Sequence, residues 1–149
     1  MNMNLLYPKS IRYTMNLKLL AACLILSSAN VFAEVKNINN HEIISFMKNG
    51  VPVVDIRRAE EWSDTGVIKQ SNLLTFFDKQ GNHNIDKWLP ELKKIVKEGD
   101  PVIIICRSGK RSGIVSKFLD EQADFTSVYN ASGGMLSWIN SNNKTIKPN

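Results

Sequence analysis

The sequence predicts an α/β domain in which a mainly parallel central sheet is covered by helices on both faces. Residues 102–105 are four consecutive β-branched residues after a proline, a run typical of a strand buried on both faces. Apolar segments of strand length also alternate along the chain with segments of helical periodicity. Finally, a short cationic loop with glycine joins the 102–105 strand to such a helix, as at the carboxyl end of a parallel strand.

A capping signal and an apolar run predict the first two elements. Asn39 and Glu42 have the spacing of a capping box, with asparagine in place of serine or threonine, and Gly50 is a stop signal. We therefore expect a first helix over residues 37–50. A buried strand is expected directly after it, over residues 51–56, because this segment is rich in valine and isoleucine.

The middle of the chain is predicted to form two helices and one weaker strand. Residues 57–62 are expected to be a loop and a short helix, and residues 67–74 a strand interrupted by polar positions. A longer amphipathic helix follows, because apolar residues recur at positions 88, 89, 92, 95 and 96 and lysines lie between them. A Gly-Asp-Pro turn then leads into the central strand.

The C-terminal third is predicted to add a helix, a strand and a short final helix. One face of the helix after the cationic loop carries the apolar residues Ile114, Val115, Phe118 and Leu119. The last strand is expected over residues 125–129, and the Gly-Gly pair at 133–134 opens the final helix. The polar tail from residue 140 onward is expected to be frayed.

Several ionisable side chains outside the cationic loop are interpreted as structural. Asp55 and Arg57 lie at the end of a predicted strand, where we expect them to pair with neighbours and order the adjoining loops. His41 and His83 are isolated in polar surroundings and are expected to be solvated. Two separate histidines without local ligand spacing do not form a zinc site with one cysteine, so we expect no metal site.

Residues 1–33 are predicted to be a secretory signal peptide. Three basic residues precede a short apolar run, and small or aliphatic residues occupy the −3 and −1 positions before cleavage after Ala33. Met15 is an alternative start that would give a more compact signal. The apolar run is too short for a transmembrane helix. A lipoprotein signal at Cys23 is a less favoured alternative, because few apolar residues precede that cysteine.

Export would leave a single periplasmic domain of residues 34–149, with its core at about residues 38–140. Its 16 basic and 14 acidic residues give a net charge of only +2, which is not a nucleic-acid-binding signature. We also expect no stable membrane insertion. Cys106 would be its single thiol, so no internal disulfide can form, and a free thiol in an oxidising compartment is a liability unless it has a use.

Cys106 is therefore the candidate nucleophile. It follows the central strand directly and precedes a helix whose first N–H groups and partial positive charge can bind an anion. These neighbours favour the thiolate over the thiol, whereas a buried structural cysteine is the less favoured alternative. Arg107, Lys110 and Arg111 in the loop that follows add positive charge beside it.

Residues 106–113, Cys-Arg-Ser-Gly-Lys-Arg-Ser-Gly, resemble the active-site loop of the rhodanese (thiosulfate sulfurtransferase) family. Segments within residues 53–68 and 128–138 resemble the N-terminal and C-terminal signatures of that family, and the three segments lie in the family's order. One departure is Val67, where the family usually has histidine. We interpret that position as structural, so the departure concerns local packing more than chemistry.

The resemblance implies a five-stranded central sheet and a cysteine that carries a persulfide. Cys106 would attack the outer sulfur of thiosulfate or a similar donor and then pass that sulfur to cyanide or a thiol acceptor. The resemblance implies that the residues that bind substrate around Cys106 are Arg107, Ser108, Gly109, Lys110, Arg111 and Ser112. Their amides would surround the sulfur, and the loop cations would attract the donor. Covalent catalysis of this kind gives ping-pong kinetics. No metal or organic cofactor is implied.

Two other functions remain open from the sequence. Related folds with a cysteine in an anion-binding loop act as phosphatases or arsenate reductases, but the cysteine phosphatase pattern needs five residues between cysteine and arginine. Here Arg111 is itself the fifth residue after Cys106, so the loop is one residue short. The second alternative is a non-catalytic module that carries persulfide or forms mixed disulfides through Cys106.

Overall fold

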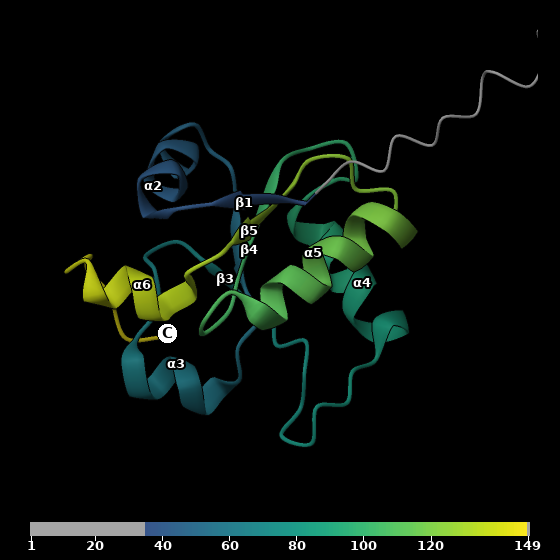
Figure 1. Ribbon diagram of the computed structural model, residues 1–149. Helices are drawn as coiled ribbons and strands as arrows, with labels where there is room; N and C mark the ends of the chain where they lie inside the picture. The colour runs from purple at the N-terminus through teal and green to yellow at the C-terminus, as the bar shows by residue number, and fades with distance from the viewer. Residues whose placement is uncertain (1–34, 149) are drawn as a thin grey trace, which may run out of the picture. The chain divides into compact units, whose positions relative to one another are not determined.

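The computed structural model describes residues 35–148. The predicted signal peptide, its cleavage after Ala33 and the alternative lipidation of Cys23 lie outside the described residues. Within them, five parallel strands form one sheet in the order β1-β5-β4-β2-β3 (Figure 1). The strands are β1 (Lys36–Ile38), β2 (Val53–Asp55), β3 (Asn72–Leu73), β4 (Val102–Ile105) and β5 (Val128–Ala131). The predicted parallel α/β architecture is confirmed.

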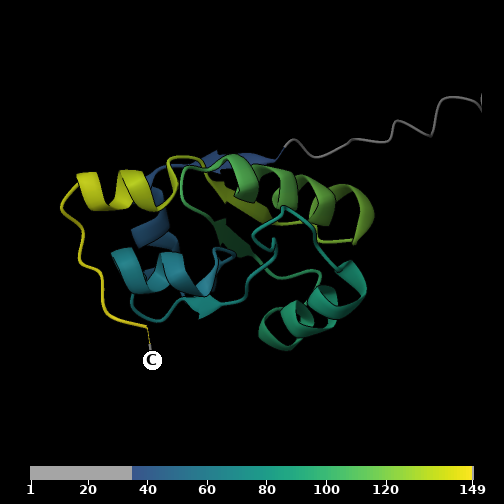
Figure 2. The same ribbon diagram turned by 90° about the horizontal axis from the view of Figure 1, so that it is seen from below.

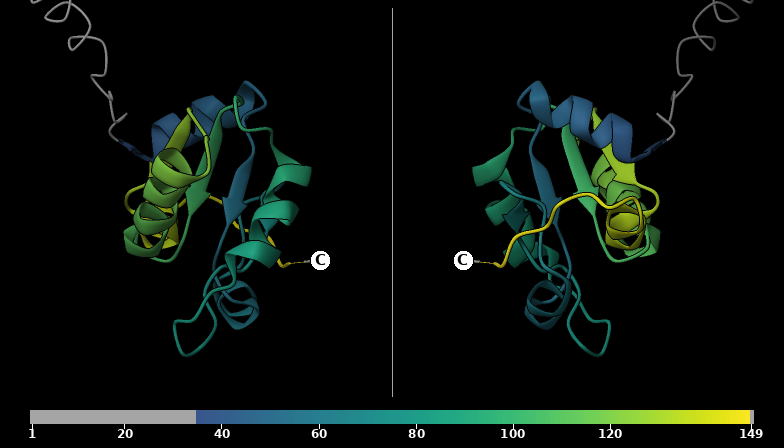
Figure 3. Two further views of the ribbon diagram at one scale, coloured as in Figure 1. Left: turned by 90° about the vertical axis from the view of Figure 1, so that its right-hand side faces the viewer. Right: turned by 90° about the vertical axis from the view of Figure 1, so that its left-hand side faces the viewer.

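Helices cover both faces of this sheet, as a parallel sheet requires (Figure 2). The helices are α2 (Asn40–Lys48), α3 (Ala59–Thr65), α4 (Ile85–Ile95), α5 (Lys110–Gln122) and α6 (Gly134–Asn140). Helices α4 and α5 pack on one face, and α2 and α6 on the other, as two opposite side views show (Figure 3). The remaining helix, α3, lies near the end of the sheet where β4 leads into α5 (Figure 1).

Alternating side chains of the central strands divide the interior into two cores. In β4, Val102 and Ile104 face α4 and α5, where they meet residues such as Trp88 and Leu119. The other two β4 residues join the opposite core, below α2 and α6. All four β4 residues are fully buried. The uninterrupted apolar run of this strand is therefore explained by burial on both faces.

The strand register places two loops side by side at the carboxyl edge of the sheet. Asp55 pairs with Ile105, and the Ile56 amide donates to the Ile105 carbonyl at 3.0 Å. Cys106 and Arg57 therefore leave adjacent strands at nearly the same level. This edge is where open parallel sheets form their binding sites.

Most predicted elements are confirmed, and several bounds are corrected. The capping box at Asn39 and Glu42 is present, but the first helix begins at Asn40, and the residues before it form the edge strand β1. The predicted strand over 67–74 contains only the two-residue strand β3, and the last strand begins at Val128 rather than at residue 125. Ile114 is 62% exposed, so it lies off the apolar face assigned to its helix.

The C-terminal tail is held against the domain, so the prediction that it frays is wrong for residues 143–146. Ile146 and Val67 exchange two backbone hydrogen bonds, of 2.9 and 3.0 Å, in an antiparallel bridge. The indole of Trp138 donates to the Lys144 carbonyl at 3.1 Å. The tail thereby connects the end of α6 to the segment after α3.

The described residues, 35–148, contain neither a membrane-spanning helix nor a group of side chains that could bind a metal. Between residues 35 and 148, no helix combines the length and apolar character needed to cross a membrane. Over the same residues, no three side chains among histidine, cysteine, aspartate and glutamate are grouped so that they could hold a metal ion.

Candidate active site

Cys106 lies immediately after β4, with its side chain fully buried. The Gly109 amide points to its sulfur at 3.2 Å, and the Ser112 hydroxyl lies 3.3 Å from it. The Ser112 hydroxyl is also 3.1 Å from the Gly109 carbonyl. Both neighbours of the sulfur are neutral polar groups at the start of α5, so they can stabilise a sulfur anion without forming an ion pair with it.

Gly109 is the residue that bends the chain around the sulfur. It is the N-cap of α5 and has a φ of 87°, in the left-handed region that favours glycine. A Cβ atom added there would lie 1.8 Å from the Ser132 carbonyl oxygen. Glycine is therefore required twice at this position, for its backbone angle and for the close approach of the β5–α6 connection.

The beginning of α6 holds the other side of the cysteine loop (residues 106–112). The Met135 amide donates to the Cys106 carbonyl and the Leu136 amide to the Arg107 carbonyl, both at 2.9 Å. Gly134 permits this approach, since a Cβ atom there would lie 2.5 Å from the Cys106 carbonyl oxygen. The loop is thus fixed by backbone groups that lie almost thirty positions away in the sequence.

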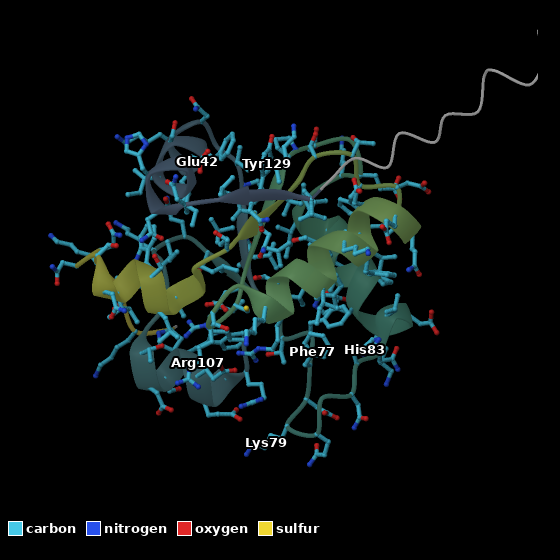
Figure 4. The ribbon with its side chains drawn as sticks, in the orientation of Figure 1. Glu42, Phe77, Lys79, His83, Arg107 and Tyr129 are labelled. Carbon is cyan, nitrogen blue, oxygen red and sulfur yellow. The ribbon has the colours of Figure 1, made fainter. Side chains whose placement is uncertain are left out.

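The three loop cations differ in their surroundings. Arg107 and Lys110 are exposed, and Figure 4 shows the labelled Arg107 side chain on the α3 side of the loop. Arg111 is half-buried and donates to both carboxylate oxygens of Glu61, at 2.6 and 2.9 Å. Although no carboxylate lies between Cys106 and Leu119 in the sequence, α3 brings one to the loop. The positive charge expected there is therefore partly neutralised.

The pair shifts the titration of both its members. Burial acts to raise the pKa of Glu61, but hydrogen bonds from Arg111 and from the Arg58 amide together lower that pKa. Glu61 in turn raises the pKa of Arg111, mainly through the same hydrogen bonds. The two side chains stay ionised near neutral pH, and they tie α3 to the first turn of α5.

Asp55 and Arg57 form the structural pair that the sequence predicts. Both side chains are 1% exposed, and the guanidinium donates to the carboxylate through Nε at 2.9 Å and Nη2 at 2.7 Å. Arg57 also binds the Thr65 hydroxyl and the carbonyls of Glu61 and Gly66, at the end of α3. The pair therefore holds α3 beside the cysteine loop.

The structure brings together most of the predicted site residues. Gly109 and Ser112 contact the sulfur, while Arg107, Ser108 and Lys110 are exposed around it. His41 and His83 are exposed as predicted, and His83 stacks on Phe76. Sequence reasoning missed Glu61 as the partner of Arg111.

Sequence reasoning also missed the backbone amides of α6 that support the cysteine loop. The Gly-Gly pair at 133–134 predicts only the start of the final helix, and nothing local to it indicates the cysteine loop as its contact.

The arrangement is a buried thiol in a cradle of neutral donors at a helix N-terminus, bordered by exposed cations. Such a site can stabilise a sulfur anion or the extra sulfur of a persulfide. The sulfur itself is fully buried.

Comparisons with known proteins agree with this geometry. The model of the rhodanese-like domain family matches residues 36–141. YtwF of Bacillus subtilis, whose name describes a candidate sulfurtransferase, is 35% identical over 86 residues, which cover 58% of this chain and 71% of YtwF. Rhodanese-like domain-containing protein 17 of Arabidopsis thaliana is 26% identical over 111 residues, 72% of this chain and 70% of that protein.

A solved structure shows the same fold. The crystal structure of a rhodanese-related protein from Thermoplasma volcanium superposes with a TM-score of 0.58 at 25% identity, covering 76% of this chain and 99% of that one. The family model covers both the cysteine loop and the Glu61 segment. The chain therefore belongs to the rhodanese-like domain family.

Proposed function

We propose that this protein is a sulfurtransferase that carries sulfane sulfur on Cys106. In the first half-reaction, the Cys106 thiolate attacks the outer sulfur of thiosulfate or a similar donor, an S–S bond forms and sulfite leaves with the electron pair of the broken bond. In the second, cyanide or a thiol removes the outer sulfur and the thiolate returns. The single observation that carries this proposal is the Cys106 sulfur held by the Gly109 amide and the Ser112 hydroxyl.

The local groups support each half-reaction in a distinct way. The Gly109 amide and the N-terminus of α5 stabilise negative charge on sulfur before and after transfer. Arg107 and Lys110, which are exposed at the rim, attract a dianionic donor. Arg111 contributes less to this attraction than its sequence position suggests, because Glu61 occupies its guanidinium. Sulfurtransferase names among the relatives, including YtwF, agree with the proposal.

Export belongs to the same proposal. The N-terminal residues have the composition of a signal peptide cleaved after Ala33, which would place the domain in the periplasm. Thiosulfate is a dianion, and an extracytoplasmic transferase would meet it without transport across the inner membrane. Sequencing the N-terminus of the protein from its native host tests the assignment: Glu34 as the first residue supports it, and an acylated Cys23 contradicts it.

A non-catalytic persulfide carrier is the second candidate, and one observation favours it. The Cys106 side chain is 0% exposed, so a sulfur stored there would be shielded from solvent thiols. A carrier would accept sulfur and release it only to a docked partner. The two candidates share the persulfide and differ in whether small molecules can discharge it.

Mass spectrometry of the intact protein after thiosulfate treatment tests both candidates. A gain of one sulfur atom on Cys106, removed by cyanide with repeated turnover, supports the transferase. A gain that cyanide and small thiols leave in place supports the carrier. No gain with thiosulfate, polysulfide or another sulfane donor would contradict both.

A further inference from the structure

A cavity of about 310 Å³ opens beside the cysteine loop, and the proposed half-reactions do not by themselves require it. It lies between α3 and α6, and Arg107 of the cysteine loop forms one of its edges. The side chains that characterise it are Arg58, Asp64, Arg107, Met135, Leu136 and Ile139.

The cavity begins one residue from the nucleophile. Arg107 follows Cys106 directly, and the Leu136 amide holds its carbonyl at 2.9 Å. Met135 forms part of the wall and binds the Cys106 carbonyl through its amide, also at 2.9 Å. A molecule in the cavity therefore lies against Arg107, the residue that directly follows the one carrying the reactive sulfur.

One wall of the cavity is apolar and open to solvent. Leu136 is 43% exposed and Ile139 is 36% exposed, although both belong to a helix with a fully formed buried face. Large apolar side chains that remain exposed beside a concave surface are typical of ligand-binding walls. They favour a ligand with an apolar body.

The opposite wall is charged, and most of its charges are already paired. Glu61 pairs with Arg111, and Arg58 pairs with Glu60. Within residues 35–148, the lining charges without an ion-pair partner are the cation of Arg107 and the carboxylate of Asp64. Arg107 can bind one negative group of a ligand, while Asp64 disfavours a second.

The volume exceeds what an inorganic sulfur donor needs. At about 30 Å³ for each water in the liquid, the cavity corresponds to roughly ten water molecules, whereas thiosulfate has five heavy atoms. It lies at the lower end of the size range of pockets for small organic ligands. The space therefore suits an organic molecule of a few carbon atoms.

From these observations we infer that the cavity is the acceptor subsite, and that it takes organic thiols with an apolar body and a single negative charge. This inference rests on the proposed function. The acceptor thiolate attacks the outer sulfur of the protonated Cys106 persulfide. A bond forms between the acceptor sulfur and the outer sulfur of the persulfide. The bond between that outer sulfur and Cys106 Sγ breaks, and its electron pair stays on Sγ, which becomes a thiolate again. The product is the persulfide of the acceptor, and no further oxidant or reductant is consumed.

The test measures how fast different acceptors discharge the preformed Cys106 persulfide of the full-length domain. ω-Mercaptoalkanoates of increasing chain length are compared with 6-mercaptohexanol, mercaptosuccinate and cyanide. Each methylene that enters the cavity should raise the second-order rate constant about two- to fourfold. The rate constant for mercaptohexanoate should exceed that for the neutral 6-mercaptohexanol. The rate constant for mercaptosuccinate, which has two carboxylates, should be lower than that for a mercaptoalkanoate of similar size with one carboxylate.

Variants assign these preferences to the walls. Leu136→Ser and Ile139→Ser should each lower the ratio of the mercaptohexanoate rate to the cyanide rate at least threefold. Ile114→Ser is the matched control, because Ile114 is also exposed but lies on α5 outside this cavity, and its ratio should equal that of wild type. Arg107→Gln should abolish the preference for mercaptohexanoate over 6-mercaptohexanol. Asp64→Asn should raise the rate constant for discharge by mercaptosuccinate.

The outcomes separate the two levels of the proposal. A persulfide that cyanide discharges, with thiol rates independent of chain length and of Leu136 and Ile139, would overturn the acceptor subsite and leave the sulfurtransferase intact. Failure to form a persulfide would overturn the proposed function. In that case hexanoate binding is followed by NMR, where saturable shifts of the Asp64 and Leu136 amides support the cavity as a ligand site and their absence overturns it.

Discussion

The adjacent strands β4 and β2 end at the same edge of the sheet, and each is followed by a buried polar group. The group after β4 has neutral hydrogen-bond partners, whereas the group after β2 is an ion pair. After β4, Cys106 places a thiol among neutral donors, with Gly109 and Ser112 as its polar neighbours. After β2, Asp55 and Arg57 bury two opposite charges within 2.7 Å of each other. Both groups are almost completely shielded from solvent.

The difference lies in how completely each group is satisfied. The guanidinium of Arg57 binds a carboxylate, a hydroxyl and two carbonyls, so its charge is fully occupied and holds α3 in place. The hydrogen-bond partners of the Cys106 sulfur are two neutral groups, the Gly109 amide and the Ser112 hydroxyl, which can stabilise a sulfur anion. The buried ion pair therefore has a structural role, whereas the sulfur keeps the capacity for the chemistry that we propose for it.

Replacing Cys106 should have the largest effect of all, and this effect should be on activity and not on stability. Cys106→Ser should abolish thiosulfate:cyanide transfer, because a hydroxyl without a neighbouring base is a poor nucleophile. The melting temperature should change little, since the Gly109 amide and Ser112 can also bind a hydroxyl oxygen. Steady-state kinetics and thermal unfolding measure the two effects. Retained turnover in this variant would show that another residue carries the sulfur.

Breaking the charge pair after β2 should have the opposite effect. Asp55→Asn leaves the Arg57 guanidinium buried without its counter-charge, which costs about 3–5 kcal/mol. Chemical denaturation should show this loss, while the folded fraction still forms a persulfide. Glu60→Gln is the matched control: it removes an exposed partner of Arg58 with a 2.8 Å contact, and it should cost far less stability than Asp55→Asn because solvent screens exposed ion pairs. Equal losses in the two variants would contradict the structural role of the buried pair.

The glycine that shapes the cysteine loop tests how far its geometry can be changed. Gly109→Ala introduces a left-handed strain of about 1–2 kcal/mol and a collision with the Ser132 carbonyl that costs about 1–3 kcal/mol more. Gly81→Ala is the matched control, because Gly81 has a φ of 85° but open space around its Cα. The control should lose only the strain component in denaturant unfolding. If both variants lost equal stability, the contact with Ser132 would not constrain the loop.

Removing the ion pair between Glu61 and Arg111 should have the smallest effect on stability, and this effect should depend on pH. Glu61→Gln removes the carboxylate partner of half-buried Arg111 and should cost about 1–2 kcal/mol at neutral pH. The pKa of Glu61 is lowered by folding, so its ionised form stabilises the native state above its ordinary value of 4.5. That contribution is lost as the pH falls below this value, towards the lowered pKa of the folded state.

Urea unfolding of wild type and Glu61→Gln between pH 7 and pH 3 measures this difference. The difference between their free energies of unfolding should be constant near neutral pH and should decrease as the pH falls. Glu91→Gln provides a control, because its exposed pair with Lys94 has the same 2.6 Å contact but should contribute less than about 1 kcal/mol. A gap that widened as the pH fell would contradict the assigned direction of the pKa shift.

The sequence alone determined the parts of this protein that depend on neighbouring residues. The β-branched run before Cys106 predicted a strand buried on both faces, and the capping box at Asn39 and Glu42 located the first helix. The same local order placed the cysteine between a strand end and a helix N-terminus. These features follow from periodicity and short-range hydrogen bonding, which a single segment contains in full.

Only the tertiary structure decided which distant groups complete the site. Glu61 lies 50 positions before Arg111, and α3 reaches it because Arg57 anchors that helix. The α6 amides hold the cysteine loop, and Ile146 returns to pair with Val67, through backbone groups that every sequence possesses. The edge strand β1 has three residues and one buried side chain, too little for a local pattern. Packing selects such partners, because each segment offers many equivalent donors and acceptors and only the assembled sheet brings particular ones together.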